Sequence, residues 1–182
     1  TASFNANIAS WNTANVTNTS YMFVNNPVFN QNIGGWNTGN VTTMQQMFYN
    51  ADSFNQSLNS WNTANVTSMT SMFQSATAFN QNLSTWSINT TNAVSMSQMF
   101  RSATSFNSSL AGWNVSKVYN FYAMFYAAPV FNQDLSTWIT TGMSGSMQYM
   151  FGAATAFNGN ITNWNTTAIT DMSYMFSGAT SF

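Results

Sequence analysis

Cysteine, histidine and glutamate are absent from this sequence of 182 residues, and only five side chains are charged near neutral pH, giving a formal net charge of −1. Without cysteine the chain has neither a disulfide framework nor a thiolate zinc site. Binding to nucleic acid or to an anionic lipid surface depends on clustered Lys and Arg, and the chain has only Arg101 and Lys117. No apolar run is long enough to cross a membrane. We therefore expect no nucleic-acid partner and no direct membrane insertion of this segment.

The groups on which most enzymes rely are also scarce, because general acid–base catalysis needs positioned His, Glu, Asp, Lys or Cys side chains. The three carboxylates, Asp52, Asp134 and Asp171, stand at three different positions of the repeat described below, so they form no dyad and no metal cluster. The glycines form neither a G-x-G-x-x-G motif nor a calcium-binding nonapeptide array. We predict a protein that is not an enzyme and has no catalytic, cofactor-binding or metal-binding residues.

Tryptophan marks an internal repeat that runs through the whole sequence. The intervals between successive Trp residues are 25, 25, 25, 27, 25 and 26 residues. The seven are Trp11, Trp36, Trp61, Trp86, Trp113, Trp138 and Trp164. A Phe-Asn pair precedes each Trp and a Met-Phe pair follows it, so that 15 of the 16 Phe residues occupy two positions of the unit. The unit reads F-N-x-x-[IL]-x-x-W-N-T-x-N-V-T-x-M-S-x-M-F-x-x-A-x-x, and residues 1–182 form a single repeat array.

A unit of this length is too short for two packed helices, which need about 33 to 45 residues in helical repeats. Each unit is therefore expected to be one coil of a solenoid, in which the Trp positions, Trp61 among them, and the Phe-Asn positions are buried and stacked from coil to coil. Apolar residues from Val41 to Ala51 follow a helical spacing, which predicts a short helix. Phe29–Ile33 is expected to form a short parallel strand, although its spacing would also suit a helix. The predicted fold is an α/β solenoid of seven coils of about 25 residues, each with a short parallel strand and a short helix.

All insertions fall between Trp and the Met-Phe pair. The unit of Trp86 gains two residues there, and the unit of Trp138 gains one. We predict that both bulge from one edge without disturbing the stack, because lengthening a loop costs little closure entropy. The sequence begins and ends in the same phase of the repeat, with apolar residues up to both ends. Solenoids normally end in atypical polar units, so we expect a segment of a longer protein or of a filament.

Asparagine recurs next to the first Phe of every unit, where we expect a structural ladder that pairs buried polar groups. These residues are Asn5, Asn30, Asn55, Asn80, Asn107, Asn132 and Asn158. Several Asn-x-Ser/Thr sequences are candidate glycosylation sites if the chain is secreted by a eukaryote. They begin at Asn15, Asn40, Asn65, Asn114 and Asn160. A Thr column at Thr13, Thr38, Thr63, Thr140 and Thr166 would suit ice or glycan binding, but it is interrupted in the fourth and fifth units.

The fifth unit departs from the consensus because it is rich in tyrosine. Lys117, Tyr119, Tyr122 and Tyr126 lie close together in the sequence. Tyrosine is frequent at interaction sites, since it offers a large apolar area and a hydroxyl group. We interpret these four residues as a candidate interaction patch, with local repacking of the unit as the alternative.

The segment V-T-T-M-Q-Q-M-F-Y-N-A-D-S-F from Val41 to Phe54 resembles the BspA-type leucine-rich repeat, whose units run V-T-x-I-x-x-x-A-F-x-x-C-x-x-L. It is more similar to the variant of that repeat found in mycoplasma surface lipoproteins, which carries F-N-x-x-L-x-x-W and M-F-x-x-A. The resemblance covers the whole chain and implies a leucine-rich-repeat-like solenoid in a surface or secreted protein that adheres to host proteins or cells. This chain departs from the family in having Asn where typical units have Asp.

Two functions follow from these observations. The first is a non-enzymatic extracellular or cell-surface repeat protein that mediates adhesion or protein binding. The second is a structural subunit of an extracellular filament or sheath, because scarce charge removes the repulsion that keeps solenoids apart. The expected partners are other protein chains, including copies of this chain end to end or side by side, and no cofactor is expected.

Overall fold

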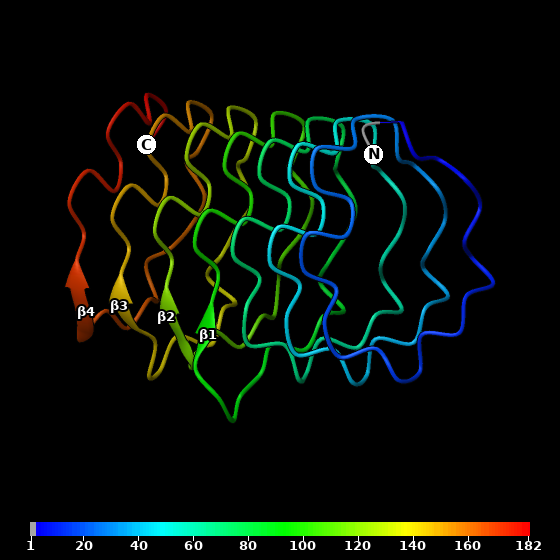
Figure 1. Ribbon diagram of the computed structural model, residues 1–182. Helices are drawn as coiled ribbons and strands as arrows, with labels where there is room; N and C mark the ends of the chain where they lie inside the picture. Colours follow the sequence, from blue (N-terminus) through cyan, green and yellow to red (C-terminus); the bar gives the residue numbers. More distant parts are fainter. Residues whose placement is uncertain (1–2) are drawn as a thin grey trace.

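The computed structural model describes residues 3–182, in which the chain winds into a stack of coils (Figure 1). One coil corresponds to one repeat, because the Phe of each Phe-Asn pair stacks on its counterpart one repeat later. The ring centroids of these neighbours lie 5.7–6.1 Å apart. The column runs through Phe4, Phe29, Phe54, Phe79, Phe106, Phe131, Phe157 and Phe182. The register predicted from the repeat is confirmed.

Short strands form one parallel sheet along one edge of the stack (Figure 1). They are β1 (Val94–Ser95), β2 (Val118–Asn120), β3 (Ser144–Ser146) and β4 (Ala168–Asp171), paired in that order. Single parallel bridges continue the same row of pairing back to the first coil. They join Asn18 to Thr43, Thr43 to Ser68, and Ser68 to Ser95. Each coil thus contributes one short extended piece to this edge.

The predicted α/β solenoid, with a helix and a strand in each coil, is wrong in both elements. Residues 3–182 contain no helix, and the segment from Val41 to Ala51 instead pairs at Thr43 and continues as consecutive turns. The paired residues lie where the helix was expected to begin. Phe29–Ile33, the expected strand, belongs to neither a strand nor a helix.

The turn segment explains why a helix is unfavourable here. Alternate amides from Met44 to Asn50 donate to backbone carbonyls of the next coil at 2.9 Å each. The amides of Met47, Tyr49 and Ala51 close turns on the carbonyl three residues earlier, at 3.1–3.2 Å. A helix would direct all of these N–H groups to its own carbonyls, and this side of the coil would lose its hydrogen bonds to the next. The turns therefore satisfy the same backbone groups and also join the coils.

Residues with positive φ, in the left-handed region, make these turns possible. Two positions in each coil, four residues apart, have positive φ, and 13 of the residues that occupy them are not glycine. They are Tyr21, Asn25, Gln46, Asn50, Ser71, Ser75, Gln98, Ser102, Ala123, Ala127, Tyr149, Ala153 and Tyr174. This conformation costs an L-residue roughly 1–2 kcal/mol, and it interrupts any right-handed helix. The residues at these positions are not part of the apolar pattern, so the apolar spacing from Val41 to Ala51 does not reveal their positive φ.

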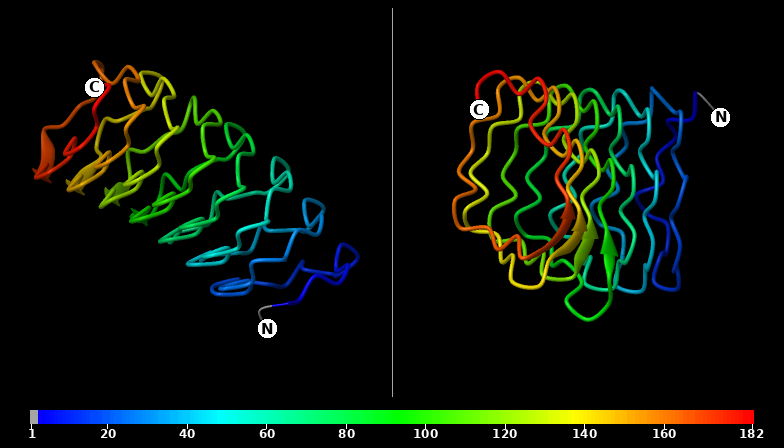
Figure 2. Two further views of the ribbon diagram at one scale, coloured as in Figure 1. Left: turned by 90° about the horizontal axis from the view of Figure 1, so that it is seen from above. Right: turned by 90° about the vertical axis from the view of Figure 1, so that its left-hand side faces the viewer.

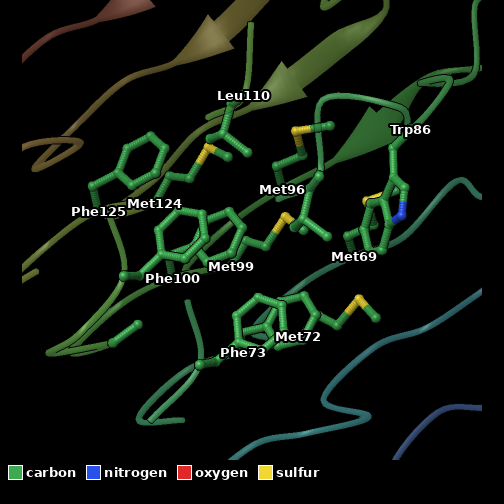
Figure 3. Packing of buried hydrophobic residues seen from close by; sticks show 14 of the residues in the cluster. Met69, Met72, Phe73, Trp86, Met96, Met99, Phe100, Leu110, Met124 and Phe125 are labelled. Atoms are coloured by element: carbon green, nitrogen blue, oxygen red, sulfur yellow. The ribbon is translucent and has the colours of Figure 1, made fainter. Parts of the chain in front are cut away.

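Aromatic columns fill the core between the two edges. The ring centroid of Phe48, in the second coil, lies 3.9 Å from that of Phe54, at the start of the third. Each of these rings stacks on its counterpart one repeat later. Figure 3 shows the side chains of Met72 and Met99 extending from the same coils beside the rings of Phe73 and Phe100. Methionine is flexible enough to fill the irregular space that stacked rings leave. The core is therefore continuous from coil to coil.

Tryptophan adds a directed bond to this packing. Trp61 is 3% exposed, and its Nε1 donates to the backbone carbonyl of Ile33 in the preceding coil at 3.1 Å. The equivalent bond, of 2.9–3.1 Å, is made by Trp36, Trp86, Trp113, Trp138 and Trp164. Trp11, in the first coil, is 53% exposed. The predicted burial of Trp61 is confirmed.

The stack is curved, and its strands lie on the inner side of the curve (Figure 2). Neighbouring strands of a sheet lie about 4.7–4.9 Å apart. The Phe rings of neighbouring coils are 5.4–6.1 Å apart. The rings therefore hold the coils further apart in the core than the strands do at the edge.

The insertions leave this stack intact, as predicted. Phe79 and Phe106 flank the longer insertion and remain stacked at 6.0 Å, while Phe131 and Phe157 flank the shorter one at 5.9 Å. Both insertions lie at the lower edge in Figure 1, where the green loop before β1 is the more prominent. The buried Asn89 organises that loop, since its Oδ1 accepts backbone hydrogen bonds from Thr91 and Asn92.

Replacing Ala127 with glycine is expected to raise the free energy of unfolding by about 0.5–1 kcal/mol, because Ala127 has a φ of +53° that glycine adopts without a Cβ penalty. The equivalent position of the last coil already holds Gly178, with a φ of +77°. Urea unfolding of Ala127→Gly would measure the change. The matched control, Ala128→Gly at a buried neighbour, should destabilise the protein. Destabilisation by Ala127→Gly of the size found for Ala128→Gly would contradict the turn geometry.

Truncation of Trp61 to alanine should cost about 3–5 kcal/mol, as for other large core side chains. Trp61→Phe separates the lost hydrogen bond from the lost packing, because it keeps an aromatic ring but leaves the carbonyl of Ile33 without the indole donor. Chemical unfolding of both variants gives the two free-energy changes. A cost for Trp61→Ala below that for Trp61→Phe would show that the ring does not contribute to the core.

Candidate functional site

The Asn that follows each core Phe joins neighbouring coils through its side chain. Asn55 Oδ1 accepts hydrogen bonds from the backbone N–H of Asn80 at 3.0 Å and from Nε2 of Gln81 at 2.9 Å. The backbone bond recurs at 2.7–3.0 Å along the column Asn5, Asn30, Asn55, Asn80, Asn107, Asn132 and Asn158. All seven side chains are exposed. The column therefore lies on the surface, and the prediction that these Asn side chains are buried is wrong.

Thr13, Thr38, Thr63 and Thr140 of the Thr column are buried and are used by the stack itself, whereas Thr166 in the last coil is exposed. Thr13, Thr38 and Thr63 each donate from Oγ1 to a backbone carbonyl of the next coil, at 2.9–3.1 Å. Thr63 is fully buried, and Thr140 is 5% exposed. These hydroxyl groups are not available for an ice- or glycan-binding surface.

Three of the candidate glycosylation residues, Asn15, Asn40 and Asn65, lie in turns, whereas Asn114 forms a parallel bridge with Ile139 and Asn160 lies outside the turns and strands. Asn40 and Asn65 are exposed, and each donates from Nδ2 to a carbonyl of the preceding coil at 2.7 Å. Asn160 is exposed and Asn114 is half-buried, and both accept a hydrogen bond from the N–H two residues later. Asn15, in the first coil, is exposed. Glycosylation at these residues stays a prediction.

The Tyr-rich patch predicted from the fifth unit divides into two places. Tyr122 and Tyr126 join tyrosines of the next coils, with Tyr149 as their common neighbour. Lys117 and Tyr119 belong instead to the sheet edge. Val118 of β2 is buried while Tyr119 is 47% exposed, and Tyr119 is the extra residue where β2 pairs irregularly with β1.

The first place is an aromatic cluster that spans four coils. The ring of Tyr149 is nearly perpendicular to those of Tyr122 and Tyr126, at interplanar angles of 88° and 84°, and it stacks on Tyr174 at 4.7 Å. Arg101 lies with its guanidinium carbon 5.1 Å from the centre of the Tyr126 ring. We call these five residues the tyrosine cluster. Burial and the neighbouring Tyr174, Tyr122 and Tyr126 raise the pKa of Tyr149.

Gly152 makes room for this cluster. A Cβ at this position would lie 2.8 Å from Cδ2 of Tyr126 and 3.3 Å from Cδ1 of Tyr149. Real Cβ atoms do not approach other atoms as closely as the first of these distances. The absence of a side chain at Gly152 is therefore a steric requirement for the observed position of the Tyr126 ring.

The tyrosine cluster could have been found in the sequence by aligning the units and comparing residues at the same position. Tyr149 and Tyr174 stand at the same position of neighbouring units, as do Arg101 and Tyr126. Residues that share a position stack on one another in the coils. Grouping tyrosines by their proximity along the chain, as the sequence analysis did, instead joined Tyr119 to residues that lie elsewhere.

Two carboxylates act as turn caps. Asp134 Oδ1 accepts a hydrogen bond from the N–H of Ser136, and Asp171 Oδ1 from that of Ser173, both at 2.8 Å. The side chain and then the backbone N–H of Ser136 lower the pKa of Asp134; the backbone and then the side chain of Ser173 lower that of Asp171. Within residues 3–182, no three Asp side chains are grouped so as to hold a metal ion. No helix of the described chain has the length and apolar character needed to cross a membrane.

The amino-acid sequence matches the model of one protein family along its whole length. The family model described as "Mycoplasma protein of unknown function, DUF285" matches residues 1–93, 61–151 and 87–182. The three matches overlap and together span the chain, as expected for a repeated sequence. No curated protein and no solved structure is significantly similar to the chain.

Stability is expected to be nearly constant across neutral pH and to fall only in acid. Because both Asp pKa values are lowered in the folded state, their contribution is present above the unfolded pKa of about 3.9 and is lost as the pH falls through the folded pKa. Thermal unfolding followed by circular dichroism between about pH 3 and pH 8 tests this.

Asp134→Asn is the matched variant, because Asn32 makes the same turn bond in the second coil. It should keep the melting temperature at neutral pH and reduce the loss in acid. A transition in stability near about pH 6, where His would titrate, would contradict the assignment, since the chain has no His.

Proposed function

We propose that this chain, which belongs to the DUF285 family of Mycoplasma proteins of unknown function, is a non-enzymatic repeat protein outside the cell or at its surface, where it mediates adhesion by binding other proteins. The resemblance of its units to the BspA-type repeats of mycoplasma surface lipoproteins supports this proposal. So does the lack of Glu, His and Cys, which removes most groups used in catalysis.

The curvature of the stack is the observation that carries the proposal. Curved repeat stacks bind partners on extended concave surfaces, and here the strands line the inner side of the curve (Figure 2). Tyr119 stands near the middle of this edge on β2, with nearly half of its side chain exposed. Lys117 is its exposed neighbour. A large tyrosine on a concave face has the character of a binding hot spot.

The neutrality of the chain defines the chemistry of the contact. Only two cations and three anions are distributed over 182 residues, so charge attraction contributes little. Hydrogen bonds from amide and hydroxyl side chains and the aromatic area of Tyr119 would provide the affinity. Such binding should depend only weakly on ionic strength, because salt screens charged contacts more than polar or apolar ones.

The test is binding of the purified, fluorescently labelled chain to cultured epithelial cells. We expect saturable binding that mild protease treatment of the cells abolishes and that added salt changes little. Tyr119→Ala should weaken binding on the order of tenfold, the effect of removing an interface hot spot. Tyr21→Ala is the matched control, because Tyr21 is similarly exposed but lies in the turn segment of the first coil. Non-saturable binding, or equal effects of the two variants, would refute the proposal.

A filament subunit is the second candidate function. The turn segment of each of the first six coils donates four amides to the next coil, as from Met44, Gln46, Phe48 and Asn50. A hollow of about 590 Å³ lies on the open side of the first coil, between Trp11, Met22 and Trp36. A further coil, of this chain or of another copy, would cover that hollow and bond in the same register. Electron microscopy of concentrated protein would reveal filaments; a monomer at all concentrations would exclude self-assembly of this chain.

A further inference from the structure

The tyrosine cluster encloses a small hollow on the turn side of the stack. The hollow has a volume of about 240 Å³, and Arg101, Tyr122, Ala123, Tyr126 and Tyr149 line it. Drug-sized ligands occupy pockets of about 300–1,000 Å³, so this one suits a ligand smaller than a typical drug. Ala123 is buried, whereas the three tyrosines are partly exposed. The hollow is thus a shallow site whose walls are mostly aromatic.

The arrangement of the rings is suited to a cation without hydrogen-bond donors. Tyr122 and Tyr126 are each nearly perpendicular to Tyr149, so the three rings line the hollow in different orientations. The negative faces of aromatic rings attract cations, and cages of such rings bind quaternary ammonium groups. Arg101 already makes this kind of contact with Tyr126, which indicates that a ring of the cluster can hold a cation.

The guanidinium group of Arg101 adds an anion-binding element at the same hollow. None of the Asp side chains lines this hollow: Asp134 and Asp171 accept hydrogen bonds from Ser136 and Ser173, and Asp52 lines a separate hollow. Arg101 therefore keeps its positive charge available to a ligand. Guanidinium groups bind phosphate with strong, directed hydrogen bonds. A cation alone would be repelled by Arg101, whereas a zwitterion would satisfy both elements.

We propose that the tyrosine cluster is a binding site for phosphocholine, with the trimethylammonium group against Tyr122, Tyr126 and Tyr149 and the phosphate on Arg101. Gly152 keeps the site open, since a larger residue there would displace the ring of Tyr126. The site shares no residue with the sheet edge at Tyr119, so it stands or falls independently of the adhesive face.

Isothermal titration calorimetry with phosphocholine tests the site on the whole chain. We expect saturable binding, with choline and inorganic phosphate each weaker on the order of tenfold or more, since each lacks one half of the recognition. Tyr149→Ala and Arg101→Gln should each lower the affinity on the order of tenfold. Tyr149→Phe keeps the ring and should bind like the native chain. Gly152→Ala should weaken binding without removing any contacting group.

Tyr21→Ala is the control, because Tyr21 occupies the same position of the repeat as Tyr149 in a coil without the cluster. Unchanged melting temperatures identify variants that fold. Absence of phosphocholine binding, unaltered binding by Tyr149→Ala, or inorganic phosphate binding as well as phosphocholine would each overturn the proposal. Vesicles distinguish the source of the ligand: retention on phosphatidylcholine but not on phosphatidylglycerol vesicles identifies a lipid headgroup, and binding of soluble phosphocholine alone identifies a free ligand.

Discussion

The hydrogen bonds between coils in the turn segment are the constraint on which the structure depends. The strands contribute little pairing, since β1 has only two residues and β4 has four. In the turn segment, each coil donates alternate amides to the next and closes turns with those between. This pattern requires left-handed residues such as Gln46 and Asn50. Their conformational cost is offset because an amide buried without a partner would cost more, about 1–3 kcal/mol.

The core and the curvature follow from this ladder. Once the backbones are joined in register, every side chain meets its counterpart one repeat away, and the Phe and Trp residues form columns. Their spacing exceeds that of neighbouring strands, so the stack bends toward the sheet edge (Figure 2). The indole of Trp61 then meets the carbonyl of Ile33 in the preceding coil. Packing and hydrogen bonding thus repeat with the same period.

On the surface, too, residues at the same position of neighbouring units contact one another. Asn side chains from Asn5 to Asn158 form a bonded column, while Tyr149 and Tyr174 stack and Arg101 lies on Tyr126. A substitution in one unit is therefore always placed against the same position of its neighbours. Departures from the consensus gather into a cluster when they fall at neighbouring positions of successive units. Charge has little part in this, because both Asp134 and Asp171 only cap turns.

The spacing of Trp and Phe, with a period of about 25 residues, was enough to predict the repeat, its register, the burial of Trp61 and the place of the insertions. That Val41–Ala51 forms turns and not a helix could be known only from the folded chain. An apolar spacing of three and four residues is common to both, and the difference lies in left-handed residues and in bonds to residues about 24 positions away. The same holds for the tyrosines: their positions in the sequence are known, but stacking joined Tyr122 to Tyr149 and left Tyr119 on the sheet edge.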